Sequence, residues 1–85
     1  MMAIKKAAIF FLLIGDDKGR KVISLMDDAE IKQLVPAMRE LTTIAPVQQR
    51  QVWQEFVDLG YEPSMNAADT LTVVRFLLSR NRKWE

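Results

Sequence analysis

The sequence predicts an all-α fold, organised as a single domain of about five short helices. Apolar residues recur at helical spacing between residues 31 and 41, which indicates one buried helix face. Turn residues divide the 85-residue chain into five segments, and a chain of this length is typical of one domain. The short apolar run at residues 9–14 could also form a strand, but no partner strand follows it. A helical domain is therefore the expectation.

The first helix is expected over residues 3–14, which are apolar nearly all round from Ala7 onward. Gly15 follows it and can adopt the left-handed conformation found after many helices. A second helix is expected over residues 17–26, with its apolar side chains in the C-terminal half. Because Gly19 weakens its first turn by up to about 1 kcal/mol relative to Ala, this helix needs packing against the others.

The third helix has a well-marked start. Asp27 stands at the N-cap position and Glu30 follows three residues later, which is the spacing of a capping box. Pro36 lies inside this helix, where it removes a backbone donor and crowds the carbonyl of Lys32, so we expect a kink or a break near Val35. The apolar stripe predicted to lie in the core comprises Ile31, Leu34, Val35, Met38 and Leu41.

Pro46 suits the first turn of a fourth helix, which Gly60 ends. Residues 48–51 of this helix are expected to face water. A fifth helix is expected over residues 67–82, with Asn66 or Ser64 as its cap. The predicted inward residues of these two helices are Val52, Trp53, Phe56, Val57 and Leu59, then Leu71, Val74, Leu77 and Leu78.

The composition argues against an enzyme. The chain has no Cys and no His, which removes disulfides, thiolate and imidazole metal ligands, and the most frequent general base. The acidic pairs at residues 16–17 and 27–28 open helices, so capping explains them, and no glycine-rich phosphate loop occurs. We expect no catalytic residues, no metal and no cofactor.

Nucleic acid and membrane are also poor candidates as partners. With 12 basic and 11 acidic residues, the net charge of +1 gives no global field that would attract a polyanion. The basic residues near the C-terminus and Trp84 leave nucleic-acid binding as a less favoured alternative. Residues 1–14 imitate a signal peptide, but they lack a small-residue cleavage pattern and are shorter than the roughly 20 residues of a membrane span, so we expect no membrane insertion.

The apolar content is generous for so small a domain. A helix that is apolar on almost every face cannot bury all of them in a domain with a high surface-to-volume ratio. An apolar groove that accepts a helix of another protein is therefore expected.

Several stretches, read in order, resemble the N-terminal domain of the flagellar motor switch protein FliG. Residues 6–15 are similar to the family's opening K-A-A-I-x-x-L-x-x-G and lead into an acidic pair, as in the family. The resemblance departs at residues 19–21 and at Pro36, is strongest over residues 6–60, and fades in the divergent C-terminal helix at 64–85. We accordingly expect one FliG N-terminal-like domain over residues 1–85. The other matching stretches are Val22-Ile23-Ser24-Leu25-Met26, Asp28-Ala29-Glu30-Ile31, the stripe of Leu34, Met38 and Leu41, Ile44-Ala45-Pro46, Val52 and Glu55-Phe56.

The resemblance implies an armadillo-like, right-handed stack of helices in the rotor and switch complex of the bacterial flagellum, which serves motility and chemotaxis. Such a domain anchors to the cytoplasmic tail helices of the MS-ring protein and contacts neighbouring copies of itself in a ring. Its implied location is cytoplasmic, peripheral to the inner membrane at the flagellar basal body. A free-standing helical adaptor for another protein is the alternative, because fold alone does not determine function. An apolar tail helix needs large apolar anchors, and the candidate partner-binding residues are Phe10, Phe11, Trp53 and Phe56.

Overall fold

A computed structural model describes residues 2–82 of the chain. These residues form five helices and no strand, which confirms the all-α prediction. The helices are α1 (Ala3–Ile14), α2 (Asp16–Ile23), α3 (Asp28–Glu40), α4 (Pro46–Asp58) and α5 (Ala67–Arg82). Together they fold into one globule with a radius of gyration of 11.9 Å.

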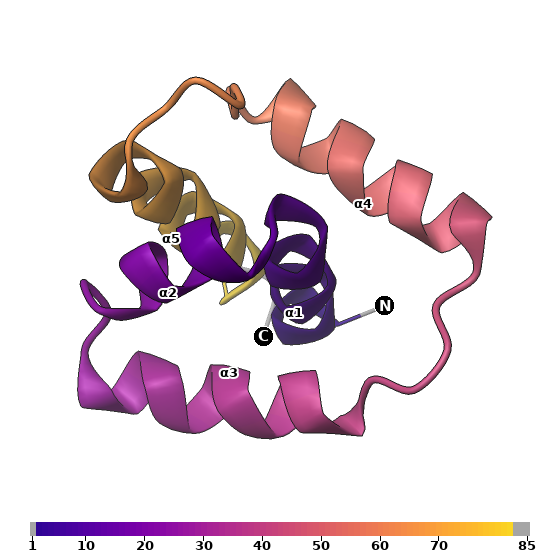
Figure 1. Cartoon of the computed structure of the whole chain (residues 1–85), viewed down its shortest axis with the longest axis horizontal. Helices are drawn as coiled ribbons and strands as arrows, with labels where there is room; N and C mark the ends of the chain where they lie inside the picture. The colour runs from indigo at the N-terminus through magenta and orange to yellow at the C-terminus, as the bar shows by residue number, and fades with distance from the viewer. Residues whose placement is uncertain (1, 83–85) are drawn as a thin grey trace.

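Helix α1 lies at the centre and packs against all four other helices. Figure 1 shows it surrounded by them, with α3 and α4 on opposite sides. This position follows from its sequence, since the five consecutive residues from Ala7 to Phe11 are all buried and only a central helix can bury every face. The armadillo-like, right-handed stacking of the helices stays a prediction.

The first two helices meet at Gly15. Its φ of +90° is a conformation that glycine adopts without strain, and it allows α2 to begin at Asp16, directly after α1 ends. Helix α2 ends at Ile23, earlier than the predicted Met26. Leu25 and Met26 instead donate their backbone N–H groups to carbonyls three residues earlier, both at 3.0 Å, so the chain tightens into a turn before α3.

Helix α3 begins with the predicted capping box. The backbone N–H of Glu30 donates to Asp27 Oδ1 at 2.9 Å, and the backbone N–H of Asp27 donates to Glu30 Oε1 at 3.0 Å. The break that was one of the two alternatives predicted near Val35 is wrong, because the helix continues through Pro36 to Glu40. The kink, the other alternative, stays a prediction. Pro36 and Lys32 are both exposed, so water can solvate the backbone group that the proline leaves without a partner. The stripe lies less deeply than predicted, with Leu34 buried and the other four residues partly buried.

Helix α4 carries Pro46 at its first turn, as predicted, and ends at a Schellman motif around Gly60. Gly60 has a φ of +106°, and the N–H of Tyr61 donates to the carbonyl of Phe56 at 2.9 Å. Two expectations for this helix are wrong. Val57 is 38% exposed, and Gln48 and Gln49 are both partly buried. The side chain of Gln49 donates to the carbonyl of Ile44 at 3.0 Å.

Helix α5 has the predicted bounds, and Asn66 is its cap, since the N–H of Asp69 donates to Asn66 Oδ1 at 2.8 Å. Its inward face buries Leu71, Val74 and Leu77 and half-buries Leu78. Of the predicted basic C-terminal cluster, Arg75 is described and forms an ion pair with Glu30. The side chains of its other members, Arg80, Arg82, Lys83 and Trp84, lie outside the described residues. Across residues 2–82, no helix combines the length and the apolarity that crossing a membrane requires.

Candidate partner-binding groove between α1 and α4

Aromatic side chains connect the centre of the core to the surface beside α4. Phe10 of α1 stacks on Phe56 of α4, with ring centroids 3.8 Å apart and planes 7° apart. The edge of Tyr61 meets Phe10 at 4.9 Å, and Tyr61 in turn meets Trp53 edge to face at 5.5 Å. Because stacked and edge-to-face pairs add to the energy of burial, Trp53 sits on a rigid aromatic support.

The four candidate partner-binding residues therefore occupy different places. Phe10 and Phe56 are fully buried and build the core under the surface. Phe11 is 2% exposed and belongs to the core, but it also lines a smaller cavity of about 130 Å³ between α1 and α2. Trp53 is only partly buried and is the member of the set that reaches the surface.

Trp53 lines an open groove of about 380 Å³ between α4 and the C-terminal half of α1. Its apolar wall is made by Trp53 and Leu13, and its polar rim comes from three residues of α4: Gln49, Arg50 and Gln54. The exposed Val57 extends this apolar wall along α4, because it lies one turn beyond Trp53 on the same side of the helix. At the rise of an α-helix, Gln49 and Val57, which share this side of α4, lie about 12 Å apart along its axis.

Polar contacts hold the walls of this groove in place. Lys6 of α1 forms an ion pair with Glu55 of α4 at 2.9 Å, and both side chains are about one-third exposed, at 27% and 32%. On α4 itself, Gln54 Nε2 donates to Asp58 Oδ1 at 2.8 Å. A surface whose side chains are already ordered loses less entropy when a partner binds.

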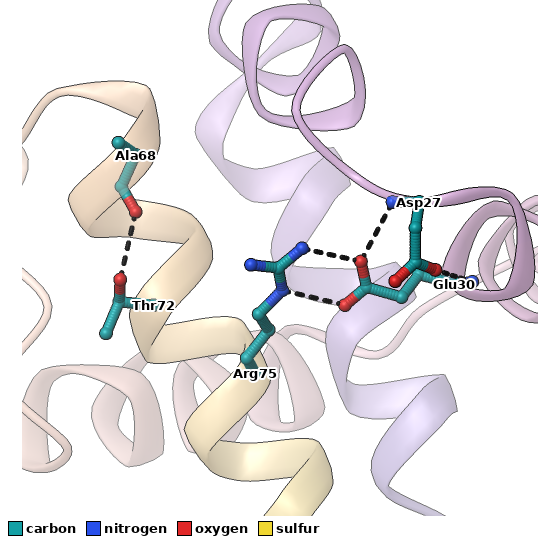
Figure 2. A network of polar contacts seen from close by, with 5 residues as sticks. All are labelled: Asp27, Glu30, Ala68, Thr72 and Arg75. Carbon is teal, nitrogen blue, oxygen red and sulfur yellow. Dashed lines mark hydrogen bonds and ion pairs between the residues drawn. The ribbon is translucent and has the colours of Figure 1, made fainter.

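A second cavity, of about 320 Å³, lies between the start of α3 and α5. Its charged groups, Glu30 and Arg75, satisfy each other through paired hydrogen bonds, which Figure 2 shows. These hydrogen bonds lower the pKa of Glu30 from 4.5 to about 2, which keeps its carboxylate ionised. This cavity has no large aromatic side chain in its lining, so the groove beside Trp53 is the better candidate for a partner helix.

Sequence reasoning identified Trp53 but missed the other groove residues. Arg50 and Gln49 belong to a polar run that was expected simply to face water, and Leu13 was not distinguished within the apolar first helix. A local signal existed on α4, because residues 49, 53 and 57 follow at i, i+4 and i+8 and so share one side of the helix. Within the described part of the chain, no three acidic side chains come close enough to hold a metal ion.

Comparison with known proteins now adds the family. The family model of the FliG N-terminal domain matches residues 1–83, including the last helix, where the resemblance in sequence fades. The flagellar motor switch protein FliG of Thermotoga maritima is 28% identical over 61 residues, which make up 72% of this chain and 18% of that protein. The chain thus spans less than a fifth of the length of this relative. No solved structure matches the chain. These names designate a motor switch protein and not an enzyme, and the chain belongs to the FliG N-terminal domain family.

Proposed function

We propose that this chain is a protein–protein interaction domain of the flagellar rotor and switch complex, and that its α1/α4 groove anchors it to the cytoplasmic tail helices of the MS-ring protein. Family membership supports the flagellar role. The main observation in favour of the anchoring role is that Trp53 is partly exposed and packs on buried aromatic side chains. The domain would be located at the cytoplasmic face of the inner membrane, at the basal body.

The dimensions of the groove suit an amphipathic helix. A partner helix lying along α4 would cover Trp53 and Val57 with one apolar stripe, in the helix-in-groove manner of recognition. Tryptophan in the centre of such a contact is the residue type that most often dominates binding energy. The faces of the domain that the tail leaves free would contact neighbouring copies in a ring.

Titration calorimetry with a peptide from the MS-ring protein's cytoplasmic tail tests this function. We expect binding with a negative heat-capacity change, because apolar surface is buried. The Trp53→Ala variant should weaken binding by at least about tenfold, as expected for a central aromatic anchor. Phe76→Ala is the matched control, since Phe76 is 57% exposed on α5 and away from the groove.

Circular dichroism and thermal unfolding of both variants must show that they remain folded. A tail peptide that does not bind the folded domain, or that binds Trp53→Ala as tightly as the natural chain, contradicts the proposed anchoring. Binding of nucleic acid that weakens steeply with salt would instead point to the alternative of a nucleic-acid-binding domain.

A further inference from the structure

The groove beside Trp53 carries a positive charge that the domain itself does not neutralise. Arg50 lines the groove, is exposed, and has no carboxylate within 4.0 Å among the residues that the structure describes. No acidic side chain lines the groove. By contrast, the basic side chains that do pair with carboxylates are Lys6, Arg20, Lys21 and Arg75.

The rest of α4 adds to this asymmetry. The first turn of the helix contains no acidic residue, so nothing there offsets the charge of Arg50 in the following turn. Glu55 is neutralised by Lys6. Asp58, at the opposite end of the helix, accepts a hydrogen bond from Gln54 and has no basic side chain within 4.0 Å among the described residues. The surface of α4 is therefore positive near Arg50 and negative near Asp58, about 12 Å further along the helix.

We propose that the helix that docks in this groove is acidic on one flank of its apolar stripe, and that a carboxylate of that flank pairs with Arg50 while an apolar residue covers Trp53. This inference rests on the proposed function and specifies the chemistry of the partner. Arg50 and Trp53 are three residues apart on α4, so they are neighbours on the helix surface. The carboxylate must therefore lie within about one turn of the residue that covers Trp53.

Three helical peptides of about 14 residues, long enough to span the groove, provide a direct test. They share one leucine stripe and differ at a single flanking position, which is Glu, Gln or Lys. Because an exposed ion pair is weak, we expect the Glu peptide to bind about two- to fivefold more tightly than the Gln peptide, and the Lys peptide to bind most weakly. This preference should shrink at about 1 M salt, where exposed charges are screened.

Variants of the domain assign the preference to one residue. Arg50→Gln should abolish it, Arg50→Lys should retain it, and Arg39→Gln should leave it unchanged, because Arg39 is an exposed arginine on α3 outside the groove. Equal binding of the three peptides, absence of binding by all of them, or an unchanged preference in Arg50→Gln overturns the inference.

The peptide panel and the titration with the MS-ring tail test separate hypotheses, so either hypothesis can fail while the other stands. If the Glu peptide is preferred through Arg50 but the tail does not bind, the acidic-partner inference stands and the proposed anchoring falls. If the tail binds through Trp53 but the panel shows no charge preference, the anchoring stands and the inference falls.

Discussion

Arg75 of α5 donates two parallel hydrogen bonds to the carboxylate of Glu30 on α3. Its Nη2 donates to Glu30 Oε1 at 2.8 Å and its Nε donates to Oε2 at 2.9 Å, as Figure 2 shows. The same Oε1 accepts the backbone N–H of Asp27 in the capping box. One carboxylate thus caps the start of α3 and fastens α5 to it across the cavity that separates them.

Because the carboxylate of Glu30 makes both contacts, the stability of the domain should depend on pH. The hydrogen bonds from Arg75 hold the pKa of Glu30 at about 2 in the folded chain, below its ordinary value of 4.5. A group whose pKa is lowered by folding stabilises the fold above its unfolded pKa, and that contribution is lost as the pH falls towards the folded pKa. We therefore expect the free energy of unfolding to fall between about pH 5 and pH 2.

Urea denaturation of Glu30→Gln across this range isolates the effect. The variant should be less stable than the natural chain at pH 7, and the difference should vanish near pH 2, where Glu30 is being protonated in both states. Glu62→Gln is a suitable control, because Glu62 is exposed and the structure describes no side-chain hydrogen bond for it. A difference between Glu30→Gln and the natural chain that stays constant from pH 7 to pH 2 would contradict this role.

Truncation of two phenylalanines should change the free energy of unfolding by very different amounts. Phe56 is fully buried against Phe10, and removing its ring should lower the free energy of unfolding by about 3–5 kcal/mol. Phe76 is 57% exposed, and its change to Ala should stay within about 0.5 kcal/mol. Denaturant unfolding of both variants makes the comparison, with Phe56→Leu as the milder change should Phe56→Ala not fold. Similar losses for Phe56→Ala and Phe76→Ala would disprove the assigned core.

Replacement of glycine by alanine should have opposite signs at two positions. Gly19 lies within α2, where an added Cβ would meet Phe11 at ordinary contact distances of 3.6 and 3.7 Å, so Gly19→Ala should stabilise the domain by up to about 1 kcal/mol. Gly60 has a φ of +106° and open space around it, so Gly60→Ala should destabilise the domain by about 1–2 kcal/mol through backbone strain alone. Midpoints of thermal unfolding that shift in the same direction would refute this assignment.

The features that could be predicted from the sequence are local ones. The bounds of α1 and α5, the capping box at Asp27, the choice of Asn66 as one of two caps and the stop at Gly60 were all anticipated. Each depends on hydrogen bonds or backbone angles within a few residues, so the chain near that point is enough to determine it. The family could be recognised for the same reason, since ordered local motifs carry the resemblance.

Tertiary packing determined which residues are buried, which the local sequence patterns leave open. Val57 and Phe56 are adjacent apolar residues of α4, yet the neighbouring α1 buries Phe56 and leaves Val57 exposed. A kink or a break was expected near Val35, but α3 continues through Pro36, whose side of the helix faces water, where an unpaired backbone carbonyl is solvated.

The residues of the candidate site could likewise be predicted only in part from the sequence. The sequence by itself determined that large aromatic anchors were available and that Trp53 was among them. Only the tertiary structure decided that Phe10, Phe11 and Phe56 lie in the core, that Trp53 reaches the surface, and that Leu13 and Arg50 join it in one groove. The physical reason is that exposure depends on which helices cover a face, and Leu13 and Arg50, far apart in the chain, become neighbours only when α1 and α4 pack together.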